Sequence, residues 1–126
     1  MFEFVYFNQI ITKSMDLDSW IRNKKLGGFV DALKEETNEV IEAYQKKDFE
    51  NLKDELGDIL SCWLISCKLA EEQGLFNAQD VINSAIAKSI RRRPYILENK
   101  KVDKDEAYRI WQEAKLKEKN GKSINC

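Results

Sequence analysis

Apolar residues recur along this chain at spacings of three and four, the period of an amphipathic helix. The first such segment runs from about 4 to 22, and the two acids Asp16 and Asp18 predict a break near its end. Its apolar stripe consists of Phe4, Phe7, Ile10 and Ile11. No stretch shows the sustained alternation of apolar and polar residues that is typical of a strand. The pattern therefore predicts an all-α fold.

Five glycines and one proline punctuate the rest of the chain. Gly27 and Gly28 predict a turn, Asp48 is a good N-cap, and Gly74 supplies a helix stop. The further helices are expected at about 29–46, 48–73, 77–93 and 103–119. We expect one domain over 1–120, with a flexible connection at 95–102 and a disordered tail at 121–126.

The composition of the chain excludes several classes of function. The formal net charge of −1 argues against a dedicated nucleic-acid binder, which normally has a strongly basic surface. Histidine is absent, and this excludes histidine-based catalytic triads and histidine-ligated zinc sites. The cysteines at 62, 67 and 126 have no metal-type spacing and are expected to be free, buried thiols in a reducing compartment.

The N-terminal segment MFEFVYFNQII is apolar, but it lacks a basic leader and is far too short to span a membrane. From this we expect a soluble cytoplasmic protein that does not partner with a membrane.

Two acidic pairs stand beside the apolar stripes of adjacent predicted helices. Shifting the second helix onto the third by nineteen residues places Glu36 on Glu55 and Glu39 on Asp58. The first acid of each pair lies between apolar neighbours, and the second lies at the edge of the stripe. A short loop at 46–48 makes the two helices antiparallel neighbours. The two pairs are therefore expected to face each other across the helix–helix contact.

Four carboxylates in one place cannot all stay ionised without a counter-charge. Hard divalent cations prefer oxygen ligands, and Mg²⁺ usually takes a few carboxylates together with water and substrate phosphates. For a single acidic pair, a solvated surface is the more common explanation. Two pairs at matched positions on adjacent helices favour a metal site instead.

The motif EETNE (35–39) followed by ELGDIL (55–60) resembles the E-E-x-x-E…E-x-x-D signature of the MazG-type all-α nucleoside triphosphate pyrophosphohydrolases. The likeness extends over about 29–119, through the segments DFENLKDELGDIL, LAEEQGLFNAQDVI, KSIRRRPYI and RIWQEAKLKEK. The resemblance implies an antiparallel helical bundle of about five helices, completed by oligomerisation as a homodimer or homotetramer. It also implies cleavage of nucleoside or deoxynucleoside triphosphates between the α- and β-phosphates, with Mg²⁺ or, as a substitute, Mn²⁺.

The resemblance assigns roles to individual residues. The expected metal ligands are Glu36, Glu39, Glu55 and Asp58, and the expected base acting on water is Glu35 or Glu39. The expected substrate-binding residues are Lys88, Arg91, Arg92, Trp111 and Trp20. For the cations, the alternative is a helix C-terminus that carries basic residues because of the helix dipole. For each tryptophan, the alternative is packing against the core.

The sequence departs from the family at two places. Trp20 lacks the proline and the acid of the Pro-Trp-Asp segment, and residues 93–97 read RPYIL where many relatives read His-Pro-His-Val-Phe. Both departures lie where base selection is plausible. One alternative is therefore a narrow enzyme for one pyrimidine or modified nucleotide, and another is a non-catalytic helical interaction module that kept the acidic pattern as a surface. A phosphoribosyl-ATP pyrophosphatase is a weaker alternative, because it shares the chemistry of the acidic helices but less of the downstream segments.

Overall fold

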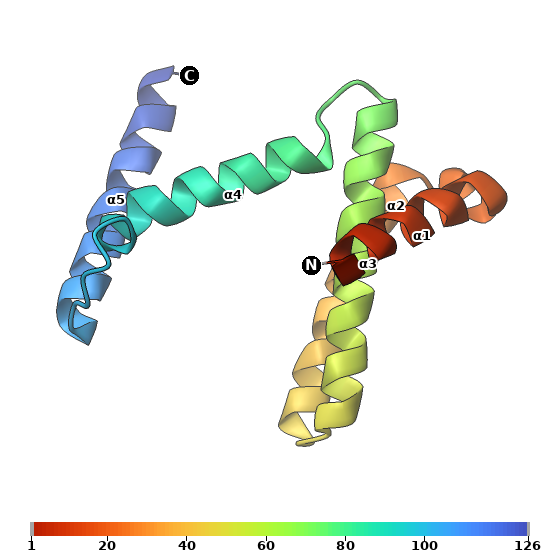
Figure 1. The fold of residues 1–126 in the computed structure, drawn as a ribbon, viewed down its shortest axis with the longest axis horizontal. Helices are drawn as coiled ribbons and strands as arrows, with labels where there is room; N and C mark the ends of the chain where they lie inside the picture. The colour runs from red at the N-terminus through yellow and green to blue at the C-terminus, as the bar shows by residue number, and fades with distance from the viewer. Residues whose placement is uncertain (1, 126) are drawn as a thin grey trace. The chain divides into compact units, whose positions relative to one another are not determined.

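The computed structural model describes residues 2–125, and these residues form helices and no strand (Figure 1). The all-α prediction is confirmed. The elements are α1 (Phe2–Leu17), α2 (Ser19–Gln45), α3 (Phe49–Glu72), α4 (Ala78–Arg92), the short 3-10 helix η1 (Pro94–Ile96) and α5 (Lys104–Asn125). Within this described part, no helix is both long and apolar enough to cross a bilayer. The described residues divide into two compact units, one that ends at Ala78 and one that begins at Gln79. The single domain expected over 1–120 stays a prediction.

In the first unit, α2 and α3 form an antiparallel hairpin, and α1 packs against both helices (Figure 1). The apolar core lies where the three helices meet. It consists of Ile11, Met15, Ile21, Phe29, Leu64, Ile65 and Leu69. Toward the 46–48 loop α1 no longer contributes to this core, and Ala43 is the buried residue of α2 there. That half of the hairpin carries the acidic pairs.

The loop between α2 and α3 forms as the sequence predicted. The Asp48 carboxylate accepts a hydrogen bond from the Asn51 amide at 3.2 Å and so caps α3. Lys47 adopts a positive φ of 56°, which reverses the chain within a few residues. A tight reversal of this kind makes α2 and α3 antiparallel neighbours in a fixed register.

The prediction of a turn at Gly27 and Gly28 was wrong. Both glycines are helical, and the break lies at Lys25, with φ 68° and ψ 170°. Gly28 instead allows the Lys24 side chain to lie close to the backbone, because a Cβ at residue 28 would lie 2.5 Å from Cγ of Lys24. The predicted break at 16–18 is confirmed, since α1 ends at Leu17 and Asp18 caps α2 by accepting from the Trp20 amide at 3.0 Å.

The second unit contains α4, η1 and α5. Asp103 caps α5 by accepting a hydrogen bond from the Glu106 amide at 2.8 Å. Ala114 is the buried residue of this unit, and α4 has no buried residue among those described. The backbone of α5 continues to Asn125, whereas the sequence predicted a helix to about 119 and a tail from 121. Cys126 lies outside the described residues.

The two cysteines that the structure describes are both free thiols, as predicted. Cys67 is buried, and Cys62 is partly buried beside the core. Burial raises the pKa of both thiols. In addition, the charge of Glu36 raises the pKa of Cys62, whereas that of Lys24 lowers it.

Candidate functional site

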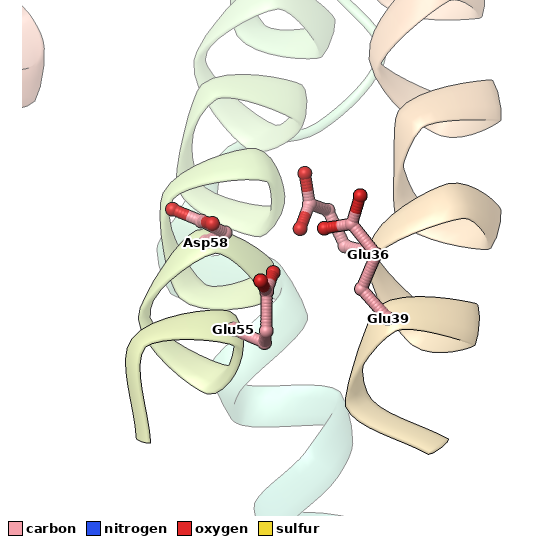
Figure 2. A group of neighbouring side chains, drawn as sticks. All are labelled: Glu36, Glu39, Glu55 and Asp58. Carbon is pink, nitrogen blue, oxygen red and sulfur yellow. The ribbon is translucent and has the colours of Figure 1, made fainter. Parts of the chain in front are cut away.

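The two acidic pairs face each other across the α2–α3 hairpin. Glu36 and Glu39 come from α2, and Glu55 and Asp58 come from α3 (Figure 2). One carboxylate oxygen from each residue can be chosen such that all four lie within 4.8 Å of one another. The predicted convergence of the two pairs is therefore confirmed.

Helical periodicity explains the convergence. Residues three apart on a helix lie on the same side, so each pair presents two carboxylates in one direction. Glu36 and Glu55 are half-buried, whereas Glu39 and Asp58 are exposed. This matches the prediction that the first acid of each pair lies inside the apolar stripe and the second at its edge.

The two half-buried carboxylates, those of Glu36 and Glu55, are energetically unfavourable for folding. Oε2 of Glu36 and Oε2 of Glu55 are buried, and neither has a hydrogen-bond partner among the described residues. Burying an acceptor without a donor disfavours folding, because the atom loses its hydrogen bonds to water. Two such atoms side by side therefore indicate that the hairpin is built to receive a donor or a cation at this point.

The titration of these groups reflects their crowding. The close approach of the Glu39 carboxylate, followed by burial and by the contact with Glu36, raises the pKa of Glu55 to about 7. Burial raises the pKa of Glu36 as well, and its contact with Glu39 raises it further. In both cases the surroundings favour the proton-bearing form, because a second negative charge in this space is repelled.

The donor set fits a hard divalent cation. All four groups offer carboxylate oxygens, which suit Mg²⁺ and Mn²⁺ rather than metals that require thiolate or imidazole. A cation would also supply a partner for the two buried oxygens. Glu35, the other acid assigned a role, is exposed on α2 and is not part of the four-carboxylate group.

Trp20 belongs to the first unit and is not a core residue. Its side chain is 58% exposed, and its ring lies edge-on to that of Phe29 with centroids 6.1 Å apart. The ammonium of Lys24 lies 4.9 Å from the centroid of each ring. Core packing, the alternative that the sequence left open for Trp20, therefore accounts for only part of its surface.

In the second unit, the predicted phosphate-binding residues form a cluster around one acid. Nε of Arg91 donates to Oε1 of Glu118 at 2.7 Å, and Nη2 of Arg92 donates to Oε2 at 2.9 Å. The Arg92 guanidinium lies 6.0 Å from the centroid of Trp111, and the Lys115 ammonium lies 5.0 Å from it. Lys88 is exposed on α4.

Sequence reasoning missed Lys115 and Glu118. The available signal was their spacing of four and seven residues from Trp111, which places all three on one side of α5. The four carboxylates lie in the first unit and the arginine cluster lies in the second.

A family model described as the MazG nucleotide pyrophosphohydrolase domain matches residues 28–97. The chain is 33% identical over 103 residues to the nucleoside triphosphate pyrophosphohydrolase/pyrophosphatase MazG of Thermotoga maritima, covering 82% of this chain and 39% of that protein. It is 31% identical over 90 residues to the nucleoside triphosphate pyrophosphohydrolase of Escherichia coli K12, and this match covers 71% of this chain and 34% of that protein. The chain thus spans well under half the length of these curated relatives.

Two further similarities concern proteins with less specific names. The chain is 34% identical over 87 residues to the uncharacterized protein YabN of Bacillus subtilis, covering 68% of this chain and 18% of that protein. The crystal structure of a mazG-related protein from Thermotoga maritima superposes with a TM-score of 0.76 at 29% identity. This match covers 85% of this chain and 94% of the crystallised one.

Proposed function

Because this chain belongs to the MazG nucleotide pyrophosphohydrolase domain family, we propose that it hydrolyses nucleoside or deoxynucleoside triphosphates between the α- and β-phosphates. The products are a nucleoside monophosphate and pyrophosphate, and the reaction requires Mg²⁺, with Mn²⁺ as a substitute. The observation that carries this proposal is the four-carboxylate group with its two buried, unpartnered oxygens. The names of the relatives from Thermotoga maritima and Escherichia coli support the same activity.

Glu36, Glu39, Glu55 and Asp58 are the proposed metal ligands. When bound, the divalent cation polarises phosphate oxygens and lowers the pKa of water. The exposed acids Glu39 and Asp58 stand at the open edge of the group, where substrate oxygens can approach. Glu39, or the neighbouring Glu35, is proposed to accept the proton of the attacking water.

The cationic cluster of the second unit is the proposed triphosphate-binding part. Lys88, Arg91 and Arg92 supply the donors, and the planar guanidinium of arginine suits phosphate oxygens. Trp111 lies under Arg92 and is proposed to contact the nucleotide. Trp20, which is 58% exposed, is proposed to contact the base.

The active form is proposed to be a homodimer or a homotetramer. Many apolar side chains of the single chain are exposed, among them Val30, Ile41, Leu56 and Ile86 at 52%, 48%, 51% and 52%. The absence of buried residues from α4 supports the same conclusion, because an amphipathic helix normally buries its apolar stripe. A second copy of the chain would cover these surfaces and complete a helical bundle.

The first test is pyrophosphate release from the purified protein with and without Mg²⁺, across the eight standard ribo- and deoxyribonucleoside triphosphates. Glu36→Gln and Asp58→Asn are expected to abolish turnover while leaving the helix content unchanged by circular dichroism. Turnover retained in either variant would contradict the four-carboxylate assignment. No Mg²⁺-dependent thermal shift would favour a non-catalytic interaction module, because a ligand that binds only the folded state must raise its stability.

Narrow specificity is the second candidate function. Residues 93–97 and the surroundings of Trp20 depart from the family pattern at positions where a base can be selected. A strong preference for one pyrimidine or modified nucleotide in the same panel would establish the narrow enzyme. Comparable rates for all bases would establish the broad one.

A further inference from the structure

Glu118 joins the two long helices of the second unit through two arginines. Its Oε1 accepts hydrogen bonds from Nε of Arg91 at 2.7 Å and from Nε of Arg92 at 3.3 Å. Its Oε2 accepts one from Nη2 of Arg92 at 2.9 Å. The Glu118 side chain is only 14% exposed, although it is charged and lies on an otherwise polar helix.

The contacts leave a defined part of each guanidinium uncommitted. A guanidinium has five N–H donors, and Glu118 uses only the Nε edge of both arginines. In the contacts recorded among the described residues, Nη1 and Nη2 of Arg91 and Nη1 of Arg92 donate to no carboxylate. Glu118 therefore fixes the inner edges of the two side chains and leaves outer donors for another anion.

Arg92 is held on a second side as well. Its guanidinium lies 6.0 Å from the centroid of Trp111, and its side chain is 23% exposed, compared with 47% for Arg91. Trp111 and Glu118 are two turns apart on the same side of α5. One helix thus supplies both an aromatic surface and an anionic anchor for Arg92.

We propose that Glu118 is a positioning residue, which holds Arg91 and Arg92 so that their outer guanidinium donors bind the triphosphate of the substrate together. This inference rests on the proposed function, in which the two arginines contact phosphate. Holding them in advance removes rotamer entropy that binding would otherwise cost, and it lowers the repulsion between two adjacent cations. The hydrogen bonds from Arg92 and Arg91 hold the pKa of Glu118 at about 2, so the anchor stays ionised at neutral pH.

Whether one substitution raises or lowers the affinity for a phosphate chain distinguishes a positioning role of Glu118 from a purely electrostatic effect. Glu118→Gln removes a negative charge beside two cations, so electrostatics without positioning requires tighter binding of a phosphate chain. If Glu118 positions the arginines, the same substitution must weaken binding, because the outer donors are no longer held together. If Glu118 only joins α4 to α5, the substitution would lower the melting temperature and leave the affinity for a phosphate chain unchanged.

The experiment is calorimetric titration of the full-length chain with inorganic tripolyphosphate in EDTA, well below the melting temperature. Glu118→Gln is expected to weaken binding roughly tenfold, the value of one lost charge-assisted hydrogen bond of about 1.4 kcal/mol. Glu118→Asp keeps the charge but is shorter by one methylene, so it is expected to restore only part of the affinity. Arg92→Ala is expected to weaken binding at least as much as Glu118→Gln.

Glu113→Gln is the matched control. Glu113 lies on the same helix, is 58% exposed, and pairs at 3.1 Å with Arg109 within α5. Its substitution removes one carboxylate and one ion pair from α5 without touching α4, and it should leave the affinity for tripolyphosphate unchanged.

The outcomes keep this inference distinct from the proposed function. Unchanged or tighter binding by Glu118→Gln overturns the inference, as does the lack of measurable tripolyphosphate binding by the unsubstituted chain. Neither result contradicts the proposed function, because that function is tested by Mg²⁺-dependent turnover, which depends on the four carboxylates. Conversely, weakened binding by Glu118→Gln in a chain that turns over no nucleotide would support the positioning role and reject the proposed function.

Discussion

Glu36 and Glu55 each place one carboxylate oxygen in the buried contact between α2 and α3, and no hydrogen-bond donor reaches either of them. Their partners Glu39 and Asp58 bring two further carboxylates to within 4.8 Å. Such an arrangement opposes folding in the absence of a counter-charge. A site that needs a cation to offset this cost should show it in stability as well as in activity.

Glu55→Gln is expected to raise the melting temperature in EDTA by a few degrees and to abolish the stabilisation by Mg²⁺. The amide removes one charge from the group and can donate a hydrogen bond to a neighbouring carboxylate. Differential scanning fluorimetry with and without Mg²⁺ measures both effects. Glu50→Gln is the control, because Glu50 lies on the same helix, is 88% exposed and pairs with Lys53. A full Mg²⁺ shift in Glu55→Gln would exclude Glu55 as a ligand.

The metal-free protein is expected to lose stability as the pH rises from about 4.5 to about 7. The pKa of Glu55 is raised from 4.5 to about 7 on folding, so the folded state binds this proton more tightly than the unfolded state does. The resulting stabilisation is complete below pH 4.5 and disappears as the pH passes 7. Glu118, whose pKa is depressed to about 2, contributes its stabilisation fully above pH 4.5 and does not mask the trend.

Urea unfolding in EDTA at several pH values across this window measures the trend. The slope should be shallower in Glu55→Gln than in the unsubstituted chain, since the titrating group is absent. A free energy of unfolding that stays level or increases between pH 4.5 and 7 would contradict the raised pKa.

Lys25→Gly is expected to stabilise the protein by about 1 kcal/mol, because φ 68° with ψ 170° lies in a region that is essentially restricted to glycine. Lys34→Gly is the control at an exposed, regular position of the same helix, and it should destabilise by about 1 kcal/mol. Chemical denaturation measures both. Equal destabilisation by the two variants would mean that Lys25 is not strained.

Trp20→Ala is expected to raise KM for the preferred nucleotide roughly tenfold, the usual value of one base–aromatic contact. Because the side chain is 58% exposed, the melting temperature should change little. Steady-state kinetics and a thermal melt distinguish the two readings of this residue. A large loss of stability with an unchanged KM would assign Trp20 to packing.

Ile86→Glu is expected to reduce the mass measured by light scattering from that of an oligomer toward that of a single chain. Ile86 is 52% exposed on α4, a helix without buried residues in the part described. Ser84→Glu adds the same charge at an exposed polar position of α4 and should leave the mass unchanged. If the unsubstituted chain is itself a monomer at micromolar concentration, the proposed oligomer is wrong.

The acidic site could be predicted from the sequence because its geometry is local. A spacing of three residues puts Glu36 beside Glu39 on any regular helix, and the same holds for Glu55 and Asp58. The 46–48 loop is too short for any arrangement except an antiparallel hairpin, so even the meeting of the two pairs follows from short-range rules. The division of each pair into an inner and an outer acid followed from the apolar neighbours.

Prediction failed at Gly28 because glycine is common both in turns and where a side chain approaches the backbone closely, as the Lys24 side chain does here. The sequence pattern does not distinguish the two cases. Where prediction stopped, at Glu118, the cause is a contact between distant parts of the chain. Glu118 lies 26 residues from Arg92 and 27 from Arg91, and no periodicity links positions on different helices. Helical spacing is a property of the backbone and can be read along the chain. Which side chains meet across helices depends on how the helices pack, and this requires the tertiary structure.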